Sequence, residues 1–330
     1  MFDEAISEFW EWWSGGGADG LLAAIESGED TDLPATVTGL VHAIHPMLEW
    51  QLTAGHEAAH SFALSASGER RLRGVTERWL QSAPETDGTW EFHAARIAVA
   101  LAPFDADGVT IDPGAVTLTT EWDPTYEQVD ITAHLPGTED FEESAISELV
   151  LYLLDATLGE DDTERWVGII DPVPERPMGA IGLASLPEII EDTTRQATND
   201  GWIAAEQRLS KRETVIATVN VSLKYLDHLA HSFHLEVRIH LNESTPLGMP
   251  TEEEASVIVA IEDEVFELLG DDVVFVARET GVNQLVMHFY GTDPDRLEQA
   301  IAPWSDEHPT HRIDFDILID PEWSTISQLT

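Results

Sequence analysis

Cysteine is absent from this chain of 330 residues, and lysine nearly so, since Lys211 and Lys224 are its two lysines. Without cysteine there are no disulfides, iron–sulfur clusters, Cys-ligated zinc sites or thiol nucleophiles. Long apolar runs are missing too, and no stretch approaches the roughly 18 uncharged residues that a membrane span needs. The opening Met1-Phe2-Asp3-Glu4 has no basic segment of the kind that begins a signal peptide. We therefore expect a cytoplasmic protein with no membrane partner.

Positive charge is scarce: 63 acidic residues stand against 16 basic ones, for a formal net charge of −47. In dilute buffer such a surface repels itself and destabilises the compact state. At molar salt the Debye length falls to about 3 Å, and most of that repulsion is screened. The composition is typical of a protein from a salt-accumulating halophile. Nucleic acid is not expected as a partner, because phosphate binding needs a positive face.

The length of the chain predicts two domains, because single hydrophobic cores stop growing near roughly 250–300 residues. Hydrophobic residues make up 43% of the chain, enough to fill real cores. Turn-forming residues gather at Asn199-Asp200-Gly201, after a stretch rich in proline and glycine. The predicted domains are therefore residues 1–198 and 199–330.

The first half is expected to be a helical lead-in followed by two sets of the order β-β-α-β. Apolar residues at helical spacing begin at Phe2, and Ser14-Gly15-Gly16-Gly17 is expected to be a plain linker that ends this helix. The expected strand, strand, helix, strand segments are 48–54, 61–66, 69–81 and 90–94 in the first set, and 116–121, 128–134, 141–158 and 166–170 in the second.

The second half shows clearer alternation. Apolar residues recur at every second position over 214–224 and 232–240, which predicts two half-buried strands. A helix follows, with Thr251 as its cap and Glu254 three residues later. A hairpin at 273–290, a helix at 294–301 and a strand at 312–319 complete the order ββαββαβ. The predicted fold class is α+β, with two domains that are each an antiparallel sheet carrying helices on one face.

Several scattered residues of the second half carry a family resemblance. They are Trp202, Pro250, Ile261-Glu262-Asp263, Arg278 with Thr280-Gly281, Phe289-Tyr290, and Asp320 with Trp323. In these the second half resembles the bacterial domain-of-unknown-function family numbered six hundred and ninety-five. The first half is similar to a companion region in some such proteins, at Phe9-Trp10, Ala83-Pro84, Trp90-Glu91-Phe92 and Leu158-Gly159-Glu160. The resemblance implies a fold and no activity.

The sharpest motif is His56-Glu57-Ala58-Ala59-His60, which matches the H-E-x-x-H pattern of zinc hydrolases. That chemistry needs both histidines one turn apart on a helix, the glutamate as general base and a third ligand. Strand-like segments flank the motif closely, which leaves room for a hairpin turn and none for a helix of three turns. We therefore expect a solvated turn and no metal site, with a metal-dependent hydrolase using His56, Glu57 and His60 as the alternative.

Candidate binding residues lie in the second half: Glu262, Asp263, Arg278, His288 and Tyr290. Paired carboxylates can perform acid–base chemistry, although Glu262 is also well placed to pair structurally with Arg278. A histidine and a tyrosine on one strand face can bind a ligand.

A second cluster of histidines comprises His228, His231, His234 and His240. On the strand predicted at 232–240, His234 and His240 are expected to share the polar face with Glu236 and Arg238. A transition metal could bind there, but a charged solvent face is the plainer interpretation.

Taken together, the sequence predicts a non-catalytic cytoplasmic binding or regulatory protein, with no cofactor and with a protein or small molecule as its ligand. Its working surface would be the polar face of the second sheet or the cleft between the domains. Besides the metal-dependent hydrolase, a further alternative is an acidic decoy that inhibits a nucleic-acid enzyme by binding its basic surface.

Overall fold

The computed structural model describes residues 2–28, 32–210 and 213–329. The chain divides into two compact units. The N-terminal unit comprises residues 1–123 and 128–196, and the C-terminal unit comprises residues 124–127 and 197–330. The predicted α+β class is confirmed. Within the described residues, no helix is both long and apolar enough to cross a lipid bilayer.

The N-terminal unit begins with three helices, α1 (Phe2–Trp12), α2 (Ala18–Ser27) and α3 (Leu33–Ile44). The segment Trp13–Gly17, predicted to be a plain linker, is instead a wide helical turn that joins α1 to α2. Gly16 has a φ of 120°, which a side chain would disfavour, so the chain changes direction there without a loop. Trp10 and Trp13 are buried against Phe62 and Trp79 in the core beneath this turn.

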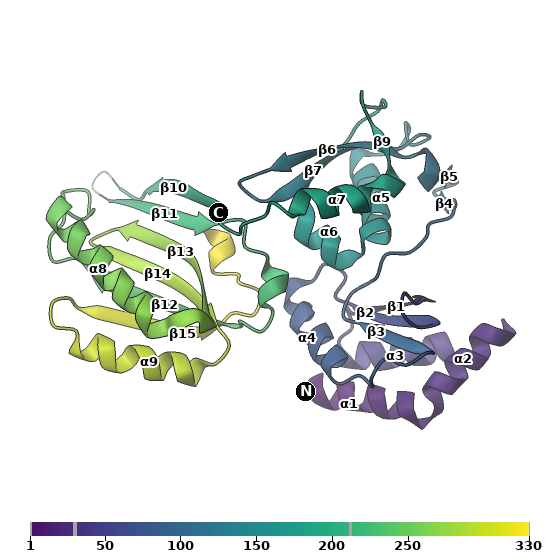
Figure 1. Ribbon diagram of the computed structural model, residues 1–330, viewed down its shortest axis with the longest axis horizontal. Helices are drawn as coiled ribbons and strands as arrows, with labels where there is room; N and C mark the ends of the chain where they lie inside the picture. The colour runs from purple at the N-terminus through teal and green to yellow at the C-terminus, as the bar shows by residue number, and fades with distance from the viewer. Residues whose placement is uncertain (1, 29–31, 211–212, 330) are drawn as a thin grey trace. The chain divides into compact units, whose positions relative to one another are not determined.

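Two β-β-α-β sets follow in the N-terminal unit, as predicted (Figure 1). The first is β1 (Glu49–Ala54), β2 (His60–Ser65), α4 (Arg70–Gln81) and β3 (Trp90–His93). The second is β6 (Thr117–Asp123), β7 (Gln128–His134), α5 (Glu143–Leu158) with α6 (Glu160–Trp166), and β8 (Val167–Pro172). Short strands β4 (Phe104–Ala106), β5 (Val109–Ile111) and β9 (Ile181–Gly182) and helix α7 (Leu186–Thr194) complete the unit.

The three-stranded and the four-stranded sheet of the N-terminal unit each contain a parallel pair, so the prediction of purely antiparallel sheets is wrong in this detail. Strand β3 runs parallel to β2, and β8 runs parallel to β7. In each set a helix lies between the second and third strands, and this crossover brings the third strand back in the same direction.

The C-terminal unit contains a six-stranded antiparallel sheet in the order β10-β11-β13-β14-β12-β15. Its elements are β10 (Trp202–Arg208), β11 (Thr214–Asn220), β12 (Phe233–His240), α8 (Glu252–Leu269), β13 (Val273–Gly281), β14 (Gln284–Gly291), α9 (Pro294–Glu307) and β15 (Ile313–Ile319). The predicted order ββαββαβ therefore lacks one strand, β10. This strand lies at the sheet edge with most of its residues exposed, so its sequence carries no alternation of apolar and polar residues.

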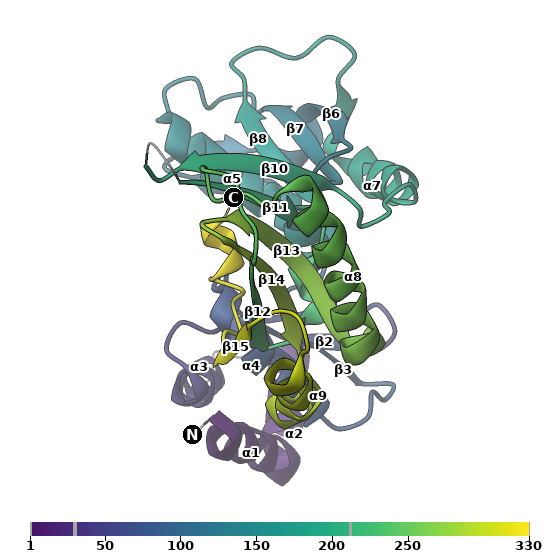
Figure 2. The same cartoon turned by 90° about the vertical axis from the view of Figure 1, so that its left-hand side faces the viewer.

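Helices α8 and α9 cover one face of this sheet (Figures 1 and 2). The core between these helices and the sheet includes Val237, Ile261, Met287 and Phe289. The opposite face, here called the polar face, is covered at one end by the short helical turns Tyr225–His228 and Ile326–Gln328. No helix covers the rest of the polar face in the described part of the unit, which makes it the natural place for a functional surface.

The C-terminal unit is expected to fold when it is produced alone. Its cores are built from residues 217–329, and a fragment beginning at Ala197 keeps them all. In molar potassium chloride this fragment should unfold in one cooperative transition followed by circular dichroism. Its melting temperature should lie below that of the full chain, because Lys224 Nζ loses hydrogen bonds of 2.9 Å to the carbonyl oxygens of Tyr126 and Glu127. A fragment without a cooperative transition would contradict the proposal that residues 199–330 are an independent domain.

Candidate functional site

The uncovered part of the polar face is hollowed across four adjacent strands of the sheet. Seven residues line this depression, which we call the sheet hollow: Val215, Glu236, Arg238, Glu279, Gly281, Gln284 and Val286. They come from β11, β12, β13 and β14 and share one face because alternate residues of a strand point the same way. Charged and amide groups thus converge over a floor that is aliphatic or, at Gly281, has no side chain.

Cross-strand register sets the neighbours inside the sheet hollow. Glu279 lies opposite Val286, and Val286 lies opposite Arg238 on its other side. Arg238 pairs with the carboxylate of Glu236 and lies 4.0 Å from that of Asp316. A Cβ added to Gly281 would meet the carbonyl oxygen of Thr214 at 2.0 Å, so the approach of β11 requires glycine there.

A hydrogen-bonded ladder of three side chains leads from the sheet hollow into the interior. His288 Nε2 lies 3.0 Å from Glu279 Oε1, and His288 Nδ1 lies 3.0 Å from His234 Nε2. His288 is 2% exposed and His234 is 1% exposed. Because a carboxylate only accepts hydrogen bonds, His288 donates from Nε2 and, when neutral, accepts at Nδ1 from His234. The ladder therefore fixes the orientation of the Glu279 carboxylate.

Burial makes protonation of His234, at the inner end of this ladder, unfavourable. Desolvation, with a smaller effect from the neighbouring His288, lowers the pKa of His234 to about 4. Asp320 acts in the opposite direction and offsets part of that shift. His234 is thus held neutral at physiological pH, while the hydrogen bond from His288 positions Glu279.

Tyr290 packs on His234, with ring centroids 5.1 Å apart, and belongs to an adjoining cluster that pins the C-terminal segment to the polar face. Its hydroxyl donates to Asp320 Oδ2 at 2.7 Å, and its ring stacks on Trp323 with centroids 4.4 Å apart. Burial, followed by the hydrogen bond to Asp320, raises the pKa of Tyr290. Burial alone would raise the pKa of Asp320 as well, but hydrogen bonds from Thr325, Tyr290 and Ser324 lower it to about 2. Tyr290 therefore acts as an anchor.

Glu262 and Arg278 lie on the other side of the sheet, under α8. Arg278 Nε is 3.1 Å from Glu262 Oε1, which is the structural pairing that the sequence allowed. Burial raises the pKa of Glu262, and the Arg278 guanidinium offsets part of that rise. Asp263, one residue further along α8, is exposed. The five candidate residues are thus divided between two faces: the structure brings Glu262 together with Arg278, and it places His288 and Tyr290 elsewhere.

The motif residues His56 and Glu57 lie in the turn between β1 and β2, and His60 begins β2. The motif is therefore not helical, in agreement with the hairpin turn that the flanking strand patterns predict. His56 Nε2 lies 3.2 Å from the carbonyl oxygen of Ala98, while the ring of His60 packs on Trp90 at 5.2 Å. The two histidines therefore have different partners, and the geometry that the hydrolase hypothesis requires is not formed.

Glu91 organises this turn, although the sequence indicated it only within a family resemblance and not as a site residue. Its carboxylate accepts three successive backbone N–H groups, from His56, Glu57 and Ala58, at 2.7–2.8 Å. Burial alone would raise the pKa of Glu91, but these hydrogen bonds and one from His93 lower it to about 2. Glu91 lies 31 positions beyond His60 in the chain, so no local pattern reveals the contact.

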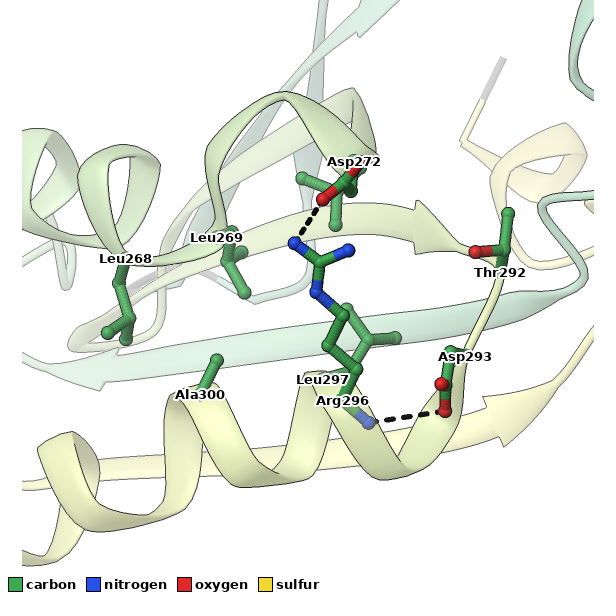
Figure 3. Close-up of a pocket in the computed structure, with 9 residues that line it drawn as sticks. Leu268, Leu269, Asp272, Thr292, Asp293, Arg296, Leu297 and Ala300 are labelled. Atoms are coloured by element: carbon green, nitrogen blue, oxygen red, sulfur yellow. Dashed lines mark hydrogen bonds and ion pairs between the residues drawn. The ribbon is translucent and has the colours of Figure 1, made fainter.

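A second hollow lies where the end of α8 approaches the start of α9 (Figure 3). Leu268, Leu269 and Leu297 supply its apolar part. The side chain of Arg296 extends across it and pairs with Asp272, as the figure shows. Asp293 caps α9 through hydrogen bonds from the backbone N–H groups of residues 295 and 296. The polar groups of this hollow are thus engaged in closing a helix junction, and we do not favour it as a site.

The remaining histidines of the second histidine cluster lie in two places, and the rings of His228 and His231 pack on each other with centroids 5.3 Å apart. His240 Nε2 lies 2.6 Å from Asp314 Oδ2, and His228 stacks on Trp323. Across residues 2–28, 32–210 and 213–329, no three His, Asp or Glu side chains are grouped so that they could hold a metal ion.

Comparison with known proteins gives one match. Residues 200–329 match the sequence profile of the Family of unknown function (DUF695). The match confirms the resemblance predicted for the second half, and the resemblance of the first half to a companion region stays a prediction. A search of curated proteins and a search of solved structures each found no match.

Proposed function

We propose that this protein, whose C-terminal part matches DUF695, is a non-catalytic binding protein that uses the sheet hollow as its ligand site. One observation carries the proposal: carboxylate, guanidinium and amide groups converge on an uncovered, partly aliphatic depression of the polar face. Binding sites commonly combine an apolar floor with a few fixed polar groups.

The chemistry of the hollow favours binding over catalysis. None of its seven lining residues is a serine, threonine, cysteine or lysine, and its two carboxylates, Glu236 and Glu279, are engaged by Arg238 and His288. Its only guanidinium, that of Arg238, is engaged by Glu236. The buried His288 orients Glu279 and does not itself line the hollow.

We also propose that the protein works in the cytoplasm of a salt-accumulating cell, with a protein or small molecule as its ligand. The net charge of −47 supports both parts, because it suits molar salt and disfavours nucleic acid. Buried charge shows the same bias: Arg73, which is 3% exposed, faces the three carboxylates of Glu160, Asp161 and Glu164. The acidic-decoy hypothesis gains no observation of its own from the described residues.

The proposal predicts that filling the sheet hollow abolishes ligand retention. Gln284→Trp places an indole over the hollow, whereas Gln299→Trp adds the same ring on the exposed side of α9, away from it. Each protein is incubated in molar salt with a small-molecule extract from a salt-accumulating organism, dialysed and denatured, and the released compounds are identified by mass spectrometry. We expect the wild type and Gln299→Trp to retain a compound that Gln284→Trp loses. Equal retention by both variants would place the site elsewhere.

A further inference from the structure

The carboxylate of Glu279 is the one charge in the sheet hollow that lacks a permanent counter-charge. Its side chain is 28% exposed, and its bonding partner is His288, whose pairing with the neutral His234 was described above. No Lys or Arg pairs with Glu279 among the described residues. Glu236, by contrast, is compensated by Arg238. The two carboxylates and one guanidinium leave the hollow with an excess of one negative charge.

The position of this carboxylate is fixed before any ligand arrives. His288 holds Glu279 Oε1 at 3.0 Å and is itself held by His234 at the same distance. Both imidazoles are almost fully buried, so neither can turn away from its partner. A preorganised acceptor loses little side-chain freedom when a ligand binds, which favours affinity.

The hollow also offers an apolar surface beside this charge. Val286 lies directly opposite Glu279 on the neighbouring strand, and Val215 lies opposite Gly281 on the other side. Because Gly281 has no side chain, the two valines border a gap in the surface. A ligand with an aliphatic stem would cover both valines while its head group reached Glu279.

From these features, and resting on the proposed function of the hollow, we infer that its ligand is an organic monocation, an ammonium or guanidinium group on an aliphatic stem. The cation hydrogen-bonds the free edge of the Glu279 carboxylate and restores neutrality. The stem packs on Val215 and Val286. Potassium ions at molar concentration also neutralise the Glu279 carboxylate, but they gain nothing from the two valines. The organic cation binds in their presence because its stem buries apolar surface.

The inference is tested with a series of small aliphatic compounds whose head groups are positive, neutral or negative. Butylammonium, butylguanidinium, 1-butanol and butyrate are titrated into the full-length protein in molar potassium chloride, and binding is followed by the NMR signals of the Val215 and Val286 methyl groups. Nα-Acetyl-lysine methylamide reports whether a lysine side chain of a protein binds as well as a free amine. Both cations should bind at least about tenfold more tightly than 1-butanol, and butyrate should bind least.

Variants assign the selectivity to one carboxylate. Glu279→Gln should weaken butylammonium binding about tenfold and leave 1-butanol unchanged. Glu298→Gln, on the exposed side of α9, should change neither and serves as the matched control. A melting temperature near that of the wild type shows that Glu279→Gln is folded, and Glu279→Asp, which keeps the charge, should retain part of the preference.

The inference fails if 1-butanol or butyrate binds as tightly as butylammonium, if Glu279→Gln leaves the cation affinity unchanged, or if no cation shifts the two valines. Neutral compounds that shift these methyl groups would overturn the cationic ligand while leaving the hollow as the binding site. The proposed function is tested separately, by whether Gln284→Trp loses the compound that the wild type and Gln299→Trp retain.

Discussion

Transfer from molar salt to about 0.05 M salt is expected to lower the melting temperature by at least roughly 10 °C. The cause is the formal net charge of −47, whose self-repulsion is screened at molar salt, where the Debye length is about 3 Å. At about 0.05 M that length exceeds 10 Å. Two unit charges 10 Å apart in water repel by about 0.4 kcal/mol, and a surface of this charge contains many such pairs. The measurement is a series of thermal melts followed by circular dichroism.

Two controls separate screening from other effects of salt. Sucrose at high concentration strengthens burial without screening charge, so it should raise the melting temperature at both salt concentrations and leave the difference between them largely unchanged. Replacing the exposed Glu8, Glu11 and Glu143 by glutamine removes three negative charges and should make the melting temperature less dependent on salt. A melting temperature that stays constant over the whole range would rule out adaptation to high salt.

Much of the fold was predictable because the spacing of apolar residues along the chain shows which face of each strand or helix is buried. The alternation over 232–240 gave β12 to within a residue, and the two β-β-α-β sets appeared in their correct order. What failed were features that local patterns do not contain. Strand β10 is exposed and shows no period, and the direction of β3 and β8 depends on where the crossover helices return the chain.

The candidate site was predictable only in part, for a similar reason. The alternation placed Glu236 and Arg238 on the polar face of the sheet, where they line the sheet hollow. It did not indicate Glu279, because a bulge between Phe275 and Ala277 shifts the register of β13. The pairing of His234 with His288 joins residues 54 positions apart, and no spacing rule connects them. The sequence could therefore indicate the surface but not the carboxylate at its centre.

Acidification from pH 7.5 to 4.5 at constant molar salt is expected to destabilise the C-terminal unit by about 3 kcal/mol. His234 binds a proton near pH 6.5 in the unfolded chain and near pH 4 in the folded one. Because the unfolded state binds more protons between these values, the stability is fully present above about pH 6.5 and is lost as the pH falls toward 4. A pKa difference of about 2.5 units corresponds to the stated magnitude. Burial lowers the pKa of His228 and His231 in the same direction, which adds to the effect.

Hydrogen exchange of the β14 amides in the full-length protein, corrected for the intrinsic effect of pH on exchange, measures this loss of stability. The equilibrium constant for opening should rise roughly a hundredfold between pH 7.5 and 4.5. His234→Gln removes the group with the largest shift, so its stability should vary much less over this pH range, even if the variant is less stable at pH 7.5. His42→Gln, at an exposed position of α3, should keep the wild-type dependence. High salt keeps the relief of acid repulsion small, since that relief would act in the opposite direction. Equal pH dependence in the wild type and His234→Gln would mean that the burial of His234 does not resist protonation.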